Sequence, residues 1–208
     1  MAKSLKTAVF SIGMRKGIFV TVTFFFIPVL VRLIGPSEYG RYAVVLSVFF
    51  FVNVFMSTGT RDAVRKYISE SSETGWQNAV FGFIFWPTIG LGLLAGLFFV
   101  TAAWSGVARL LFGEGFTSLF YLLAVFAMGR QLREFLNRTL MGLQMEHVSE
   151  PLRILERLVF VGLALITAYF GYGVEGILVA DILTSLFVIP ISAVFLRRKL
   201  DRKSTRLN

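Results

Sequence analysis

Six long apolar blocks, separated by short polar or turn-rich segments, most constrain how this chain can fold. A helix that crosses the hydrocarbon core of a bilayer needs about 20 mostly apolar residues. Only 16% of the residues are charged, whereas a soluble domain has about 25%. The sequence therefore predicts an all-α polytopic membrane protein with six transmembrane helices, at residues 9–34, 42–58, 76–103, 117–140, 152–170 and 174–196.

The first break between blocks is the segment RLIGPSEYGRYA, residues 32–43. Gly35 and Pro36 interrupt a helix, because glycine allows positive φ and proline biases its predecessor away from the α region. We therefore expect one helix to end here and another to begin. A loop or surface helix is expected at this break, GPSEYG (residues 35–40), and at the other breaks, which lie at residues 58–75, 104–115, 142–151 and 171–176.

The positive charges fall mainly on one side of the predicted membrane. If the N-terminus is cytoplasmic, the outer loops hold only Arg32, Arg41 and Arg109. An excess of Lys and Arg in inner loops sets the orientation of membrane proteins, so both termini are expected in the cytoplasm and the chain in the cytoplasmic (inner) membrane. With this placement the net charge of +9 orients the chain, and nucleic-acid binding is not expected. The inner segments hold Lys3, Lys6, Arg61, Arg65, Lys66, Arg138, Arg197, Arg198, Lys199, Arg202, Lys203 and Arg206.

The fourth block carries a polar stripe. Its apolar run stops at Met128, and the spacing i, i+3, i+4, i+7 and i+8 places the following polar residues on one face of a helix. Glu134 lies four residues from both Arg130 and Arg138, so it can pair with either. One interpretation is that Arg130, Arg133 and Glu134 line a water-filled cavity that binds an anionic group. The other is a cytosolic face whose arginines reach lipid phosphates. The stripe comprises Arg130, Arg133, Glu134, Asn137 and Arg138.

Four further polar residues interrupt apolar blocks. A cation near the bilayer centre costs about 2.5–3.5 kcal/mol, so at least one of Arg15 and Lys16 is predicted to face the same cavity. Alternatively, the first helix enters the hydrocarbon only at Gly17. Asp181 in the sixth block can pair with an arginine, bind a coupling ion or approach the outer interface. Asn53 in the second block is a candidate for coupling or for an interhelical hydrogen bond.

Several kinds of chemistry are not expected. The chain has no cysteine, which excludes disulfides and thiolate metal sites, and the single histidine, His147, has no ligand cluster around it. The segment GYGVEG, residues 171–176, matches a nucleotide-binding pattern, but it connects two predicted spans instead of a strand and a helix. No hydrolytic constellation is visible. We therefore expect no metal, no cofactor and no enzyme activity.

Three segments resemble a known family. LIGPSEYGRYA, directly after the first block and Arg32, is similar to the RxLGPxEYGxYA signature of polysaccharide-biosynthesis flippases. These flippases are the Wzx-type branch of the multidrug/oligosaccharidyl-lipid/polysaccharide (MOP) exporter superfamily. STGTRDAVRKYISE resembles the family's inner loop, and GYGVEGILVADIL resembles its turn into the sixth span.

The resemblance implies a transporter of twelve to fourteen spans, built as two six-helix lobes around a cationic cavity that alternates between the two membrane faces. It implies that undecaprenyl- or dolichyl-linked oligosaccharides are moved across the membrane. Family cavity cations would correspond to Arg15 or Lys16 and to Arg130 or Arg133. The implied partners are the lipid-linked oligosaccharide, membrane lipids and the polysaccharide polymerase machinery.

The length of 208 residues departs from the family. Residues 1–200 are expected to form one lobe of a MOP/MATE-like transporter, and residues 201–208, DRKSTRLN, a polar, non-native tail. The chain is then a fragment that lacks its C-terminal lobe, or two copies associate. Two rival functions are a drug or metabolite antiporter of the same superfamily and a non-transporting membrane scaffold. The cationic stripe favours the flippase over the antiporter, whose cavity would be acidic, and no large outer loop supports a sugar polymerase or ligase.

Overall fold

The described part of the chain is entirely helical. The computed structural model describes residues 2–56 and 59–204, with the side chains of residues 1–16, 18–20, 23 and 200–208 outside the description. Within those limits the chain has no strand, which confirms the all-α prediction. The helices are α1 (Ala2–Met56), α2 (Thr60–Ser69), α3 (Thr74–Trp104), α4 (Val107–Phe112), α5 (Phe116–Gly142), α6 (Glu146–Tyr169) and α7 (Gly173–Ser204).

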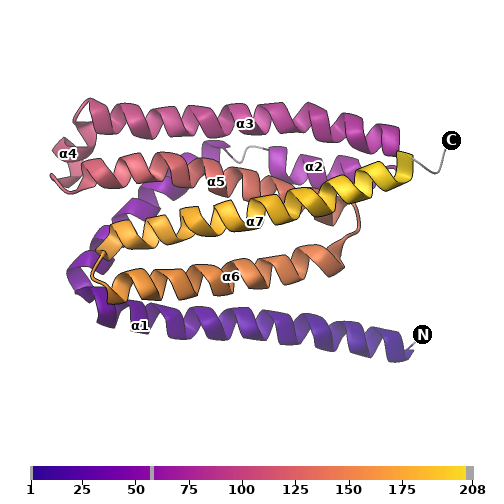
Figure 1. Cartoon of the computed structure of the whole chain (residues 1–208), viewed down its shortest axis with the longest axis horizontal. Coiled ribbons are helices and arrows are strands. Elements are labelled where there is room, and N and C mark those ends of the chain that lie inside the picture. The colour runs from indigo at the N-terminus through magenta and orange to yellow at the C-terminus, as the bar shows by residue number, and fades with distance from the viewer. Residues whose placement is uncertain (1, 57–58, 205–208) are drawn as a thin grey trace.

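The long helices lie side by side around α5. Helix α5 packs against α3 on one side and α7 on the other, α7 packs against α6, and the first half of α1 lies beside α6 (Figure 1). The short helices α2 and α4 lie at the predicted breaks, and α2 packs against both α3 and α5. Helix α1 begins and α7 ends at the same end of the molecule (Figure 1). The polar tail predicted for residues 201–208 is helical up to Ser204, and residues 205–208 lie outside the described residues.

Helix α1 bends sharply at Gly35, where φ is 83° and ψ is 160°. The break predicted from Gly35 and Pro36 is therefore confirmed, and Figure 1 shows the two halves of α1 diverging from it. The expected loop, however, is reduced to this one residue. Proline at the first position of a helix loses no hydrogen bond, so the second half can begin at once.

Replacing Gly35 by alanine is expected to destabilise the protein by about 1–3 kcal/mol, because this backbone region is essentially restricted to glycine. Nothing lies within 4 Å of a Cβ added at Gly35, so the effect is on the backbone alone. Chemical unfolding in detergent micelles measures it. Gly40→Ala is the matched control: it lies in the helix after the bend, also with nothing within 4 Å of its added Cβ, and should leave stability unchanged or slightly higher. Equal stability of the two variants would contradict the prediction.

The residues after the bend connect three helix ends. Arg41 Nη1 donates to Glu38 Oε1 at 2.6 Å, and Arg41 Nη2 donates to the backbone oxygen of Gly115 at 3.0 Å, just before α5. Glu38 Oε2 accepts a bond from the backbone N–H of Val174 at 3.3 Å, in the first turn of α7. A Cβ at Gly115 would lie 2.5 Å from Arg41 Nη2. These contacts are structural: they fix α1 against the starts of α5 and α7.

Three of the described helices are long and apolar enough to cross a bilayer. They are Phe24–Met56, Thr74–Trp104 and Gly173–Lys199. Large apolar side chains such as Phe83 and Trp104 are more than four-fifths exposed on α3 (81% and 82%), which suits a surface covered by lipid. The chain is therefore a membrane protein. Helices α5 and α6 coincide with the fourth and fifth predicted spans, but both carry several charged residues, so the count of six spans stays a prediction.

Candidate functional site

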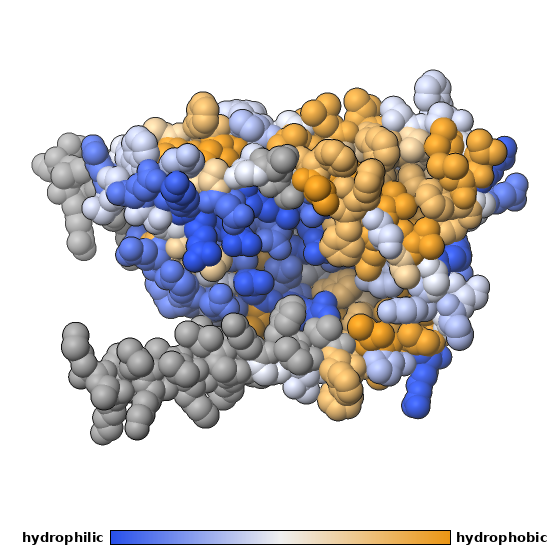
Figure 2. Space-filling view, turned by 180° about the vertical axis from the view of Figure 1, so that it is seen from behind, coloured by the Kyte–Doolittle hydropathy of each residue, from blue (hydrophilic) through white to orange (hydrophobic). Residues whose placement is uncertain are grey.

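A charged cavity lies inside the helical assembly. It has a volume of about 320 Å³ and is walled by the second half of α1 and by α5, α6 and α7. Hydrophilic side chains gather in a hollow that opens toward the end where α1 begins and α7 ends, while hydrophobic ones cover the other half (Figure 2). Arginines outnumber carboxylates by one among the charged side chains that line it: Arg130, Arg133, Arg153 and Arg157 against Glu134, Glu156 and Asp181.

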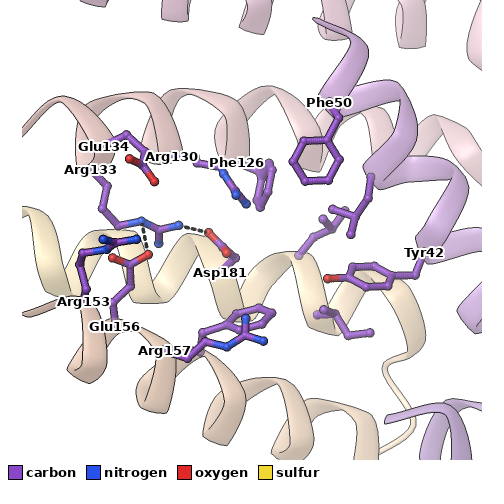
Figure 3. A pocket seen from close by; sticks show the side chains of 14 residues that line it. Tyr42, Phe50, Phe126, Arg130, Arg133, Glu134, Arg153, Glu156, Arg157 and Asp181 are labelled. Atoms are coloured by element: carbon purple, nitrogen blue, oxygen red, sulfur yellow. Dashed lines mark hydrogen bonds and ion pairs between the residues drawn. The ribbon is translucent and has the colours of Figure 1, made fainter. Parts of the chain in front are cut away.

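Arg133 is buried and held by two carboxylates from different helices. Its Nη2 lies 2.9 Å from Asp181 Oδ1 on α7, and its Nε lies 3.1 Å from Glu156 Oε1 on α6 (Figure 3). Nη1 donates to the hydroxyl of Ser185 at 2.9 Å, and this hydroxyl donates to the backbone oxygen of Asp181 at 3.0 Å. The side chain is only 6% exposed. Its positive charge is therefore compensated within the protein, and it joins α5, α6 and α7.

Arg130 lies one helical turn earlier on α5 and is held differently. Its Cζ lies 5.4 Å from the ring centroid of Phe49 and 5.7 Å from those of Phe50 and Phe126. Among the described residues no carboxylate lies within ion-pair distance of it. A guanidinium over aromatic faces is stabilised by the ring quadrupoles and keeps its N–H donors for a ligand. Arg130 is thus the cavity cation best placed to receive an anion.

Helix α6 contributes charged residues that the sequence interpretation had not assigned to the site. Arg153, Glu156 and Arg157 follow the spacing i, i+3 and i+4, the same signal that identified the stripe on α5, but they lie at the start of the predicted fifth span and were not singled out. Arg157 Cζ lies 5.5 Å from the ring centroid of Phe26 and 5.7 Å from that of Phe160. Tyr42, the last tyrosine of the signature segment, also lines the cavity and was not singled out.

The structure brings four of the predicted site residues together. Arg130, Arg133, Glu134 and Asp181 all line the one cavity, and Asp181 pairs with an arginine, which was one of its expected roles. In the part of the chain with described side chains, Glu134 forms no ion pair with Arg130 or Arg138. A helix places such residues near each other, but their partners depend on the neighbouring helices.

Asn53 and Arg138 do not line this cavity. The side chains of Arg15 and Lys16 are outside the described residues. Asn53 makes the interhelical hydrogen bond that was one of its alternatives: its Oδ1 accepts from Arg61 Nη2 on α2 at 2.7 Å, and the same nitrogen donates to Gln131 Oε1 at 2.7 Å. Burial lowers the pKa of the Arg61 guanidinium from its ordinary value. Arg138 Nη1 lies 3.6 Å from Asp62 Oδ1, and Asp62 is also on α2.

Apolar exposed helices around a charged, hollow interior define the chain as a helical membrane protein with a cavity suited to an ionic group. The chain matches the family model described as polysaccharide biosynthesis protein over residues 29–206, and it belongs to this family. The match begins just before the signature segment and confirms the resemblance to polysaccharide-biosynthesis flippases, which are in general transporters and not enzymes. No curated protein and no solved structure matches the chain.

Proposed function

We propose that this chain forms one six-helix lobe of a MOP/MATE-like flippase that moves lipid-linked oligosaccharides across the cytoplasmic membrane by alternating access. Both termini then lie in the cytoplasm, and a C-terminal lobe or a second copy supplies the other cavity wall. The family membership supports a role in polysaccharide synthesis or export. The observation that carries the proposal is Arg130, a cation in the cavity that no carboxylate compensates among the described residues.

The cavity suits the part of the cargo that cannot cross hydrocarbon unaided. A phosphate group that leaves water loses its hydration, and an apolar environment offers nothing in its place. Arg130 and Arg157 reach the cavity from α5 and α6 and would replace this hydration with charge-assisted hydrogen bonds. Arg133 already engages Asp181 and Glu156. Glu134 is the third carboxylate of the lining, and the four arginines still exceed the carboxylates by one, which suits an anion better than a cationic drug.

Binding of a polyprenyl-diphosphate-linked oligosaccharide to the purified chain in lipid nanodiscs tests this function. We expect saturable binding that inorganic pyrophosphate competes for and that weakens as ionic strength rises, since salt screens charge attraction. A neutral glycolipid with the same sugars is the matched control and should bind much more weakly. Equal binding of the charged and neutral lipids, or binding only of cationic compounds, would exclude the proposed function.

A further inference from the structure

Two arginines of the cavity, Arg130 and Arg157, make cation–π contacts with aromatic rings. Arg130 on α5 is surrounded by Phe49, Phe50 and Phe126, all within 5.7 Å of its Cζ. Arg157 on α6 repeats the arrangement with two other phenylalanines. Arg133, which lies between them in sequence, is held by carboxylates and a hydroxyl. Arg133 and Arg130 are therefore held in two different ways, Arg133 by ion pairs and Arg130 by aromatic rings.

The rings around Arg130 restrict how its guanidinium can be used. Aromatic rings attract a cation through their π faces, whereas the hydrogen-bond donors of the guanidinium lie in its own plane, as a rigid fork. Packing against rings shields the guanidinium from water without consuming its positive charge. The N–H groups that remain accessible match an oxyanion with two oxygens at fork spacing, such as a phosphate. A spherical halide matches this geometry less well.

We propose that Phe50 is a specificity-determining positioning residue, which holds the Arg130 fork toward the cavity so that it selects a phosphate-type oxyanion over a halide. This inference rests on the proposed function, in which Arg130 receives the anionic group. Phe49 and Phe126 are buried in the core, at 1% and 2% exposure, whereas Phe50 is 48% exposed and lines the cavity. Phe50 is thus the ring of the three that can be changed without opening the core.

The test is a titration of the purified chain with inorganic pyrophosphate, with and without chloride as competitor. Phe50→Leu keeps an apolar side chain but removes the ring, and we expect a Kd about three- to tenfold higher, since a cation–π contact with a half-exposed ring contributes about 1 kcal/mol. Chloride should compete better in this variant than in the unchanged protein. Phe50→Trp restores a ring and should restore both affinity and selectivity, which a loss of packing alone would not explain.

The neighbouring residue provides a matched control. Phe51 is 68% exposed and packs its ring on Phe55, so Phe51→Leu should bind pyrophosphate like the unchanged protein. Arg130→Gln separates the two hypotheses. If it binds normally, the proposed function of Arg130 fails. If it loses binding while Phe50→Leu binds as tightly and selectively as Phe51→Leu, only the role of Phe50 is overturned. Phe50→Met repeats the ring removal should Phe50→Leu not fold.

Discussion

Replacing Arg133 by glutamine is expected to destabilise the folded protein by about 3–5 kcal/mol, the usual effect of removing one partner from a buried ion pair. The change leaves Asp181 and Glu156 without their cation, and their side chains are 11% and 27% exposed. It also removes the hydrogen bond to Ser185. Chemical unfolding in detergent measures the loss, and we expect a lower yield of folded protein as well.

A charge-balanced variant distinguishes this electrostatic cause from lost packing. Arg133→Gln combined with Asp181→Asn and Glu156→Gln leaves no unpaired buried charge and should recover most of the stability. Arg153→Gln is the matched control, because Arg153 is half exposed and its nearest carboxylate is 3.9 Å away; a surface pair of this kind contributes little. If the triple variant were no more stable than Arg133→Gln, the three residues would not act as one ionic unit.

The fold was predictable where the sequence pattern is local. Apolar blocks of membrane-crossing length predicted the long helices, and Gly35 followed by Pro36 predicted the bend in α1. The sequence did not predict that the helix resumes directly after Gly35. A longer turn and a one-residue bend both use glycine and proline, so the residue types do not distinguish them. Membrane crossing by α5 and α6 could not be decided by composition, since their charged residues are tolerated only where neighbouring helices cover them.

The site was predictable to the extent that one helix determines it. The 3.6-residue period placed Arg130, Arg133 and Glu134 on one face of α5, and they do share the cavity. Which of them is paired depends on the rotation of α6 and α7 against α5, and the sequence of α5 holds no information on that rotation. The ion pair of Arg133 with Asp181 joins residues 48 positions apart. Hence the sequence predicted the charged face but not the difference between Arg130 and Arg133.

Because Arg130 forms no ion pair among the described residues whereas Arg133 does, we expect the largest functional effect from a change at Arg130. Arg130→Gln should lower export of lipid-linked oligosaccharide by about ten- to hundredfold, because a hydrogen bond to a charged group contributes about 1.5–3 kcal/mol. The protein should still fold and insert, since Arg130 forms no ion pair among the described residues and the change removes only its cation–π contacts. Surface polysaccharide in complemented cells, or flipping in reconstituted vesicles, measures export, and membrane-fraction immunoblots measure insertion.

Two control variants test this prediction: one changes the shape of the charged group at position 130, and the other removes an arginine charge outside the cavity. Arg130→Lys keeps the charge but loses the planar fork, so export should fall between those of the unchanged protein and Arg130→Gln. Arg109→Gln removes the same charge from an exposed position on α4, outside the cavity, and should export normally. Normal export by Arg130→Gln would show that the cargo does not depend on this cation. Equal loss in Arg109→Gln would attribute the effect to net charge, because the two variants differ only in where the guanidinium is removed.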